Sequence, residues 1–360
     1  MRTELVVTET LNVLLSGPGL IGRKHASLLE EHPETNLMAI VAPDNYANNE
    51  FAAHNRVPRF SSLQEALDET PTDAVIISSP NVVHFEQAAI CIESGIPVLI
   101  EKPLTETLGS AAHLVALAEA KGTPVLVGHH RTYSPLLKVA RSFLSSEQFG
   151  QPVALLGTAL FYKPDDYFVA GPWRMRKGGG PILINLIHEV GIMRHLFGEI
   201  ECVTAQASKA TRGFEVEDTA AISLSFANGA LGTFLLSDAS ASSKNWEMTA
   251  GENPAYPFYQ DQTCYHFAGS MGSLDFPSMQ IRTYDRTGVR SWWEAFSEDR
   301  LPVDRTDPLM LQLQHFVEVA CGRARPIVSV QDGYLNMVVV EAIQRAAETG
   351  NSVSIAECVA

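Results

Sequence analysis

The stretch Gly17-Pro18-Gly19-Leu20-Ile21-Gly22 decides the fold, because it follows the apolar run Asn12–Ser16 and opens the helical pattern Leu20–His32. Its glycines allow backbone amides and a helix N-terminus to approach a pyrophosphate, although an ordinary tight turn is the alternative interpretation. Lys102 follows a later strand-like run, at the carboxyl end where open α/β sheets bind ligands. Together these features predict a nicotinamide dinucleotide with a catalytic lysine beside it.

Strand-like and helical patterns alternate along the first 130 or so residues. Strands are expected at Asn12–Ser16, Leu37–Ala42, Ala74–Ser79, Pro97–Lys102 and Pro124–His129. Helices are expected at Leu20–His32, Ser62–Glu69, His84–Ser94 and Gly109–Lys121. Alternation with short connections predicts an α/β fold with a doubly wound parallel sheet, in a domain covering residues 1–131.

A second domain, residues 132–360, is expected to be α+β with a large and mainly antiparallel open sheet. Its strands are predicted at Pro152–Phe161, Cys202–Ser208, Ala220–Phe226 and Leu231–Ser237, and its helices at Pro181–Phe197, Pro308–Cys321 and Gln331–Glu348. The Asn228-Gly229 pair indicates a hairpin. Trp246–Phe267 is expected to be a long structured loop, and the face that carries Phe234 and Leu236 suggests association into a homodimer or homotetramer.

Composition narrows the classes of function. The net charge of −15 and the absence of a basic run argue against a nucleic-acid partner. No apolar stretch approaches the roughly 18 residues of a membrane span, and Met1–Thr10 has no apolar signal core. The five cysteines are scattered without CxxC spacing, which favours reduced thiols in the cytoplasm, and no metal site is expected.

Residues beyond the glycines would contact the rest of the dinucleotide. An acid at the end of the second strand normally binds the ribose 2′-hydroxyl, and here Asp44 is the nearest candidate. Arg23 and Lys24 offer instead to pair with a 2′-phosphate, so the choice between NAD and NADP stays open. Ser79-Pro80-Asn81 would line the ribose and nicotinamide, although Asn81 could simply cap the next helix.

Several motifs follow one another in a specific order: Gly17–His25 (Gly-x-Gly-x-Ile-Gly-x-x-His), Ser79–His84 (Ser-Pro-Asn-x-x-His), Glu101-Lys102-Pro103 and Gly128–Arg131. In this order the chain resembles the glucose–fructose oxidoreductase, inositol dehydrogenase and MocA family over essentially its whole length. The resemblance implies a Rossmann domain and an open-sheet domain whose exposed face commonly forms the oligomer interface.

The resemblance also implies roles for particular residues. Lys102 matches the family's catalytic lysine, and His188 matches the histidine that ends a Gly-Gly-Gly segment, here opened by Gly178–Gly180. The matched cofactor contacts are Gly17, Gly19, Leu20, Ile21, Gly22, Ser79, Pro80, Asn81, His84, Glu101, Lys102 and Arg131, with Asp44 added from its position. His188 would accept the hydroxyl proton near neutral pH, while Lys102 would donate a hydrogen bond to the same oxygen or act as the base.

This chain departs from the family pattern where the substrate would bind. Ile184 occupies the position of the family's aspartate, and Asn185, one helical turn before His188, could orient a hydroxyl without acting as a base. The apolar surroundings of His188 are also typical of a core histidine, which is what His195 is expected to be.

A cluster of aromatic and basic residues precedes the triple glycine and includes Tyr162, Trp173 and Arg174. It would either bind a substrate carboxylate or form a solvated loop with partners at Asp165 and Asp166. The expected substrate is a sugar, polyol or cyclitol, with a carboxylated cyclic cis-dihydrodiol as the alternative. There are two competing hypotheses. The protein could be a redox-neutral glycosidase or epimerase, or it could be a dinucleotide sensor without catalysis.

Overall fold

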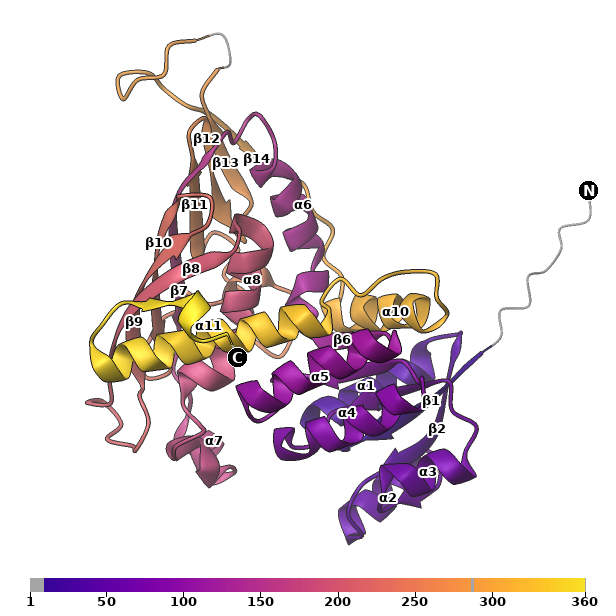
Figure 1. The fold of residues 1–360 in the computed structure, drawn as a ribbon. Helices are drawn as coiled ribbons and strands as arrows, with labels where there is room; N and C mark the ends of the chain where they lie inside the picture. Colours follow the sequence, from indigo (N-terminus) through magenta and orange to yellow (C-terminus); the bar gives the residue numbers. More distant parts are fainter. Residues whose placement is uncertain (1–9, 286–287, 360) are drawn as a thin grey trace, which may run out of the picture. The chain divides into compact units, whose positions relative to one another are not determined.

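The computed structural model describes residues 10–285 and 288–359, which form two compact units (Figure 1). The first unit contains the described residues up to His130 together with Leu309–Leu335. The second contains Arg131–Pro308 and Asn336–Val359. Each unit has its own sheet, so each is described separately below.

The first unit is built on a six-stranded parallel sheet with the order β3-β2-β1-β4-β5-β6. Its strands are β1 Leu11–Ser16, β2 Thr35–Val41, β3 Arg59–Phe60, β4 Ala74–Ile77, β5 Val98–Glu101 and β6 Val125–Gly128. Every residue of β4, β5 and β6 is buried, as expected for strands covered on both faces. The predicted doubly wound sheet is confirmed, and its strand order reverses between β1 and β4, where such sheets bind ligands.

Five helices follow these strands: α1 Leu20–Glu31, α2 Tyr46–His54, α3 Leu63–Glu69, α4 His84–Glu93 and α5 Leu108–Lys121. Thr107 and Ser110 form a capping box at the start of α5, and Gly122 ends it with a φ of +67°. The helix α2 and the short strand β3 were not predicted. Ala52 is the one buried residue of α2, so its apolar pattern is too weak to reveal it.

The second unit contains a nine-stranded sheet with the order β14-β13-β12-β11-β7-β10-β9-β8-β15. Its strands are β7 Pro152–Leu160, β8 Ile200–Ser208, β9 Thr219–Phe226, β10 Leu231–Ser237, β11 Tyr265–Gly269, β12 Gly272–Phe276, β13 Gln280–Thr283, β14 Ser297–Arg300 and β15 Val353–Ser354. The pairings are antiparallel except that of β7 with β10, so the predicted α+β domain is confirmed.

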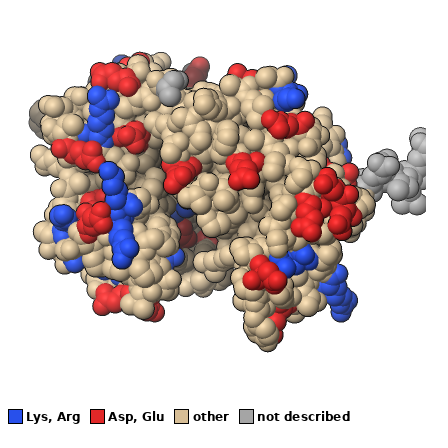
Figure 2. All heavy atoms as spheres, turned by 60° about the horizontal axis from the view of Figure 1, so that its bottom comes forward, with Lys and Arg blue, Asp and Glu red and all other residues tan. Residues whose placement is uncertain are grey.

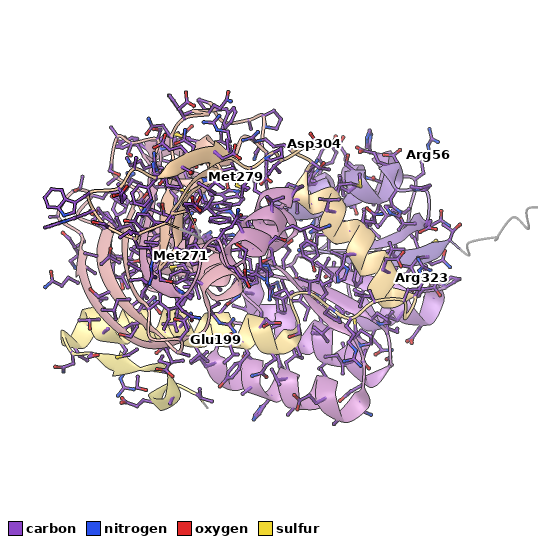
Figure 3. The ribbon with its side chains drawn as sticks, turned by 90° about the horizontal axis from the view of Figure 1, so that it is seen from above. Arg56, Glu199, Met271, Met279, Asp304 and Arg323 are labelled. Carbon is purple, nitrogen blue, oxygen red and sulfur yellow. The ribbon has the colours of Figure 1, made fainter. Side chains whose placement is uncertain are left out.

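Helices of the second unit are α6 Pro135–Leu144, α7 Asp165–Val169, α8 Ile187–Phe197 and α9 Trp246–Ala250. The helix α10, Pro308–Ala320, belongs to the first unit from Leu309 on, and α11, Val330–Thr349, belongs to the first unit up to Leu335 and to the second from Asn336 on. Nearly every residue of α8 is buried. Arg194 on α8 donates to both carboxylate oxygens of Glu199, labelled in Figure 3, and to Asn336 on α11 at 2.6 Å. These contacts fix the end of α8 against α11.

The structure differs from two predictions about the second unit, one on the exposed face of β10 and one on the segment Trp246–Phe267. The Asn228-Gly229 hairpin joins β9 to β10 as predicted, with Gly229 at a φ of +86°. Phe234 and Leu236 do not lie on an open face, however, because both are buried in the core and the outward residues of β10 are Leu231, Thr233 and Leu235. The segment expected to be one long loop begins with α9 and ends in β11, since the Asn245 side chain caps a helix there.

Figure 2 shows acidic and basic side chains interspersed over the face in view. None of the helices among the described residues is both long enough and apolar enough to span a membrane.

Candidate functional site

The glycine turn packs directly against the end of β4. Gly17 has a φ of +85°, and a Cβ there would lie 2.4 Å from the Ser79 Cα atom. A Cβ on Gly22 would lie 2.1 Å from the Gly17 carbonyl oxygen. The Ser78 hydroxyl donates to that same oxygen at 2.7 Å. Glycine is therefore required at positions 17 and 22 for α1 to start so close to the sheet.

The start of α1 fits a pyrophosphate. Gly19 is the N-cap residue, no side chain caps the helix, and a Cβ at Gly19 would meet nothing within 4 Å. Unlike its neighbours Gly17 and Gly22, it borders open space. Leu20 is 95% exposed and Ile21 is half-buried, so the first turn presents its backbone N–H groups to a ligand.

The three glycines give a prediction that separates folding from binding. Gly17→Ala should lower the free energy of unfolding by at least about 2 kcal/mol, because the left-handed φ and the Ser79 backbone both oppose a side chain. Gly19→Ala should leave it unchanged but weaken NADH binding roughly tenfold, by keeping the pyrophosphate from the backbone. Denaturant unfolding and NADH fluorescence titration measure the two effects. Equal effects of the two variants on stability would contradict this account.

Two opposite charges that could meet the adenosine ribose lie together, Asp44 after the end of β2 and Arg59 on β3. Asp44 is largely exposed and accepts a hydrogen bond from Asn49 at 2.8 Å. Arg59, from β3, lies 3.4 Å from the Asp44 carboxylate and donates to the Ala42 carbonyl oxygen at 2.8 Å. A carboxylate suits a free 2′-hydroxyl, whereas a guanidinium suits a 2′-phosphate.

The loop after β4 is tied to the loop after β5 by His84. One ring nitrogen of His84 lies 2.8 Å from the Ser79 carbonyl oxygen, and the other lies 3.0 Å from that of Pro103. Burial lowers the pKa of His84, and the two carbonyl oxygens oppose that shift. Asn81 is the first residue of a short 3₁₀ turn, and Pro80 is the N-cap of that turn. No side chain caps this turn or α4, so the prediction that Asn81 caps the next helix is wrong.

Glu101, the last residue of β5, is buried and lies 2.8 Å from the Nε2 atom of His25 on α1. Burial opposes ionisation of the carboxyl group, but the hydrogen bond and charge of His25, with the charges of His130 and Lys102, hold the Glu101 pKa below its usual value. Lys102 follows directly and is half-buried. The Glu101 carboxylate therefore binds His25 inside the protein and is not exposed to solvent.

In the second unit, His188 is the second residue of α8 and is buried. A π-helical turn, Ile182–Leu186, precedes α8 and contains Asn185, whose side-chain oxygen accepts a hydrogen bond from the Lys163 ammonium at 2.7 Å. Such turns occur frequently at functional sites. The Glu217 carboxylate accepts from the Ile182 amide at 2.8 Å and so anchors the start of this turn.

The triple glycine has a packing role of its own. Gly180 has a φ of +82°, and a Cβ there would lie 2.6 Å from the Glu217 carboxylate. Burial raises the pKa of Glu217, while its bond to the Ile182 amide opposes that shift. The glycine therefore leaves room for the carboxylate that anchors the turn before His188.

The aromatic and basic cluster forms a stacked arrangement around α7. Arg174 lies over the Tyr167 ring at 3.9 Å from its centroid and donates to the Tyr167 carbonyl oxygen at 2.6 Å. Trp173 is 54% exposed and Tyr162 56% exposed, so both rings are accessible to solvent. Arg212 lies over the Tyr162 ring at 5.1 Å. The segment from Tyr162 to Arg174 therefore carries two exposed rings, Tyr162 and Trp173, each with an arginine beside it.

Arg131 lies in a buried charged network of the second unit. Its guanidinium donates to Glu189 at 2.6 Å and to Glu247 at 2.9 Å, and lies over the Trp246 ring. The Tyr265 hydroxyl donates to the other oxygen of Glu189. Burial alone would lower the pKa of Arg131, but the two carboxylates raise it. These contacts engage the guanidinium with carboxylates of its own unit.

Glu252, near this network, should make stability depend on pH. Burial raises its pKa to about 7, while the Ser134 hydroxyl and the charge of Arg131 oppose that shift. Because the folded pKa lies above the unfolded value, the free energy of unfolding should fall as pH rises from about 4.5 to 7, by up to about 2 kcal/mol. Glu252→Gln should flatten this slope in denaturant titrations at pH 5 and 7. If the free energy of unfolding of Glu252→Gln fell with pH as steeply as that of the wild type, other groups would cause the pH dependence.

Sequence reasoning missed three residues of this site. His25 was quoted in a motif without a role, although its spacing from Gly22 already placed it on the helix after the turn. Lys163 directly follows Tyr162 of the aromatic and basic cluster, but nothing in the sequence paired it with Asn185. Arg59 gave no signal, because β3 was not predicted. The described residues contain no group of three His, Cys, Asp or Glu side chains that could hold a metal ion.

Comparison with known proteins agrees with this geometry. Residues 11–129 match the model of the GFO/IDH/MocA oxidoreductase family with an NAD-binding Rossmann fold, and residues 137–275 match the GFO/IDH/MocA C-terminal domain. Inositol 2-dehydrogenase 1 of Saccharopolyspora erythraea is 26% identical over 357 residues, covering 96% of each chain. The 1,5-anhydro-D-fructose reductase of Ensifer adhaerens is 25% identical over 311 residues, covering 85% of this chain and 86% of that one.

Solved structures show the same fold. The WlbA dehydrogenase from Bordetella pertussis, in complex with NADH and UDP-GlcNAcA, aligns with a TM-score of 0.78 at 20% identity over 96% of this chain and 99% of that chain. An oxidoreductase from Agrobacterium radiobacter, in complex with NAD+, L-tartaric acid and magnesium, aligns with a TM-score of 0.80 at 17% identity over 96% and 99%. With both domain models matched, the chain belongs to the GFO/IDH/MocA family and is an NAD(P)-dependent oxidoreductase.

Proposed function

We propose that this protein transfers hydride between a secondary alcohol of a sugar, polyol or cyclitol and nicotinamide, with Lys102 and His188 handling the hydroxyl proton. The single observation that carries the proposal is the glycine turn at the start of α1 followed by Lys102 at the end of β5, in one parallel sheet. The inositol dehydrogenase and anhydrofructose reductase names of the relatives support the substrate class.

The bound nicotinamide would supply or accept the hydride. His188 is proposed to accept the hydroxyl proton during oxidation, because an imidazole titrates close to neutral pH. Lys102 is proposed to donate a hydrogen bond to the same oxygen and stabilise its developing negative charge. Asn185, held by Lys163 at 2.7 Å, would orient a neighbouring hydroxyl, as a neutral amide can do without acting as a base.

The cofactor contacts proposed from the sequence are kept as one set. They are Gly17, Gly19, Leu20, Ile21, Gly22, Asp44, Ser79, Pro80, Asn81, His84, Glu101, Lys102 and Arg131. Arg59 joins this set because it lies beside Asp44. Titrating NAD and NADP separately into the protein and into Arg59→Met tests the adenosine end. A selective loss of NADP affinity in the variant would assign Arg59 to a 2′-phosphate.

A carboxylated cyclic cis-dihydrodiol is the second candidate substrate. It is favoured by the exposed Trp173 ring, which lies beside Arg174 and could stack on a substrate ring while the guanidinium binds its carboxylate. The exposed Tyr162 ring would offer a second stacking surface. A 4-carboxy-2-hydroxymuconate-6-semialdehyde dehydrogenase of Sphingobium is 29% identical, but over 126 residues that cover only 35% of this chain.

The decisive experiment is a substrate panel of polyols, sugars, sugar acids and carboxylated diols, assayed with NAD and NADP at the absorbance of the reduced nicotinamide. Turnover of a neutral polyol or of a carboxylated diol separates the two candidates. Solvent deuterium next to the oxidised carbon, without net cofactor change, would favour a glycosidase or epimerase. NADH binding without turnover on the whole panel, together with a recovered protein partner, would favour a sensor.

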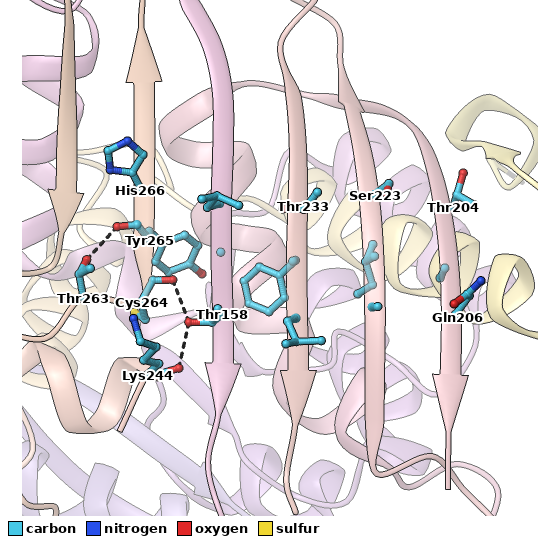
Figure 4. Close-up of a pocket in the computed structure, with 17 residues that line it drawn as sticks. Thr158, Thr204, Gln206, Ser223, Thr233, Lys244, Thr263, Cys264, Tyr265 and His266 are labelled. Carbon is cyan, nitrogen blue, oxygen red and sulfur yellow. Dashed lines mark hydrogen bonds between the residues drawn. The ribbon is translucent and has the colours of Figure 1, made fainter. Parts of the chain in front are cut away.

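We further propose that the protein associates into a homodimer or homotetramer through the open face of the nine-stranded sheet. A groove of about 650 Å³ lies along this face, lined by residues such as Thr158, Thr233 and His266 (Figure 4). Leu156 and Leu231 on this face are 60% and 62% exposed. A monomeric mass in light scattering at micromolar concentration would contradict this proposal.

We also propose that residues 1–131 form the cofactor domain and residues 132–360 the domain for substrate binding and oligomerisation. A cytoplasmic location is proposed as well. Its support is that all five cysteines are free thiols in the structure.

A further inference from the structure

The pair formed by His25 and Glu101 joins the two ligand-binding elements of the first unit. His25 lies on α1, the helix that starts at the glycine turn, and Glu101 ends β5, directly before Lys102. The two side chains are 2.8 Å apart although 76 residues separate them in the chain. Their exposed side-chain fractions are 1% and 7%. A contact this short and this buried holds both elements in one arrangement.

The surrounding backbone leaves space for this carboxylate. Glu101 pairs in register with Gly128 of β6, and a Cβ at Gly128 would lie 2.8 to 2.9 Å from the Glu101 carboxyl atoms. Any larger residue at position 128 would displace the carboxylate. A buried acid that occupies the space beside a glycine in this way is an integral part of the packing, and removing its partner would leave it uncompensated.

Charged groups face Glu101 from several elements. His25 approaches it from α1, His130 from the turn after β6, and Lys102 from the next position in the chain. His84, on α4, lies in the field of the Glu101 carboxylate. Each of these interactions is mutual, so the carboxylate that is stabilised by Lys102 also stabilises the charged form of Lys102.

We propose that His25 is a positioning residue for Lys102: it holds the buried Glu101 carboxylate ionised beside that lysine, so that Lys102 stays an ammonium and serves as hydrogen-bond donor rather than base. This rests on the proposed place of Lys102 at the substrate oxygen. With Lys102 acting only as a donor, His188 would be the one group that accepts the proton of the substrate hydroxyl. His25 contacts Glu101 and acts through that residue.

The second link, from Glu101 to Lys102, is tested without any substrate. The full-length protein is acetylated with acetic anhydride over a range of pH, and the peptide that contains Lys102 is quantified by mass spectrometry. Glu101→Gln keeps the shape of the side chain and its hydrogen bond with His25 but removes the charge. The midpoint of Lys102 acetylation should then fall by about one pH unit. Lys121, exposed on α5, is the internal control and should not shift.

The first link, from His25 to Glu101, is tested by infrared spectroscopy. In His25→Leu the buried carboxyl group loses its partner, so the band of a protonated carboxyl should appear at pH 7. Glu252, whose pKa is about 7, gives such a band in every variant, so each spectrum is compared with that of the wild type. The additional band should appear in the difference spectrum of His25→Leu and be missing from that of the double variant His25→Leu/Glu101→Gln. His113→Gln, on the exposed face of α5, is the matched control and should show no additional band.

An unshifted Lys102 midpoint in Glu101→Gln would overturn the proposal, as would the lack of an additional carboxyl band in folded His25→Leu. Circular dichroism and NADH fluorescence establish folding, and Glu101→Gln alone decides the second link if His25→Leu does not fold. Neither readout uses turnover. A failure of the proposed substrate or of hydride transfer would therefore leave these results unchanged, and can be recognised separately on the substrate panel.

Discussion

Lys102→Met is expected to lower kcat by roughly 10²- to 10⁴-fold on any substrate that the wild type turns over, while NADH binding changes little. Methionine keeps the length and apolar part of the side chain but removes the ammonium that would stabilise the substrate oxygen as it loses its proton. Steady-state kinetics and NADH fluorescence titration on the same preparation measure the two quantities.

The control for this variant is Lys121→Met, which removes one exposed ammonium at the end of α5 in the same unit. It should leave kcat within about twofold of the wild type, because an exposed surface charge has little effect on a distant site. His188→Gln should resemble Lys102→Met in its loss of kcat and should differ in the pH at which activity declines. Full turnover by Lys102→Met would exclude the proposed role of this lysine.

Arg131→Met is expected to lower the free energy of unfolding by about 3 to 5 kcal/mol. The guanidinium is buried between Glu189 and Glu247, at 2.6 and 2.9 Å. Its removal would leave the buried Glu189 carboxylate with a hydrogen bond from the Tyr265 hydroxyl but without the compensating charge of Arg131. Removing one member of a buried ion pair costs more than the pair contributes, since the other charge stays desolvated.

Denaturant unfolding followed by far-UV circular dichroism and tryptophan fluorescence measures this loss, and agreement of the two probes tests two-state behaviour. Arg300→Met is the control, because Arg300 is 40% exposed and lies 3.3 Å from Asp261, which is 83% exposed. That pair should contribute at most about 1 kcal/mol. If Arg131→Met and Arg300→Met lowered the free energy of unfolding equally, burial of the Arg131 ion pairs would not be the cause of the loss.

The elements that the sequence predicted well have strong local signals. The turn Gly17–Gly22 and the continuous apolar strands fixed the parallel sheet, because buried strands and short connections leave few alternatives. The Asn228-Gly229 hairpin was found for the same reason. By contrast, α2 and β3 have weak patterns and were missed.

Contacts between distant segments could not be predicted. The resemblance assigned Arg131 to the cofactor, but nothing in the sequence indicated that it also binds Glu189 and Glu247, which lie 58 and 116 residues away in the chain. Phe234 and Leu236 were correctly placed on one face of β10, but alternation cannot tell which face is covered by helices.

The sequence by itself determined the dinucleotide-binding sheet, the position of Lys102 after its strand and the helix that carries His188, since periodicity and turn chemistry act between near neighbours. Only the tertiary structure decided that Glu101 pairs with His25, that Asn185 binds Lys163 and that Arg131 joins a buried network. Such pairings depend on which polar groups are buried together, and burial is a property of the packed chain rather than of any local stretch.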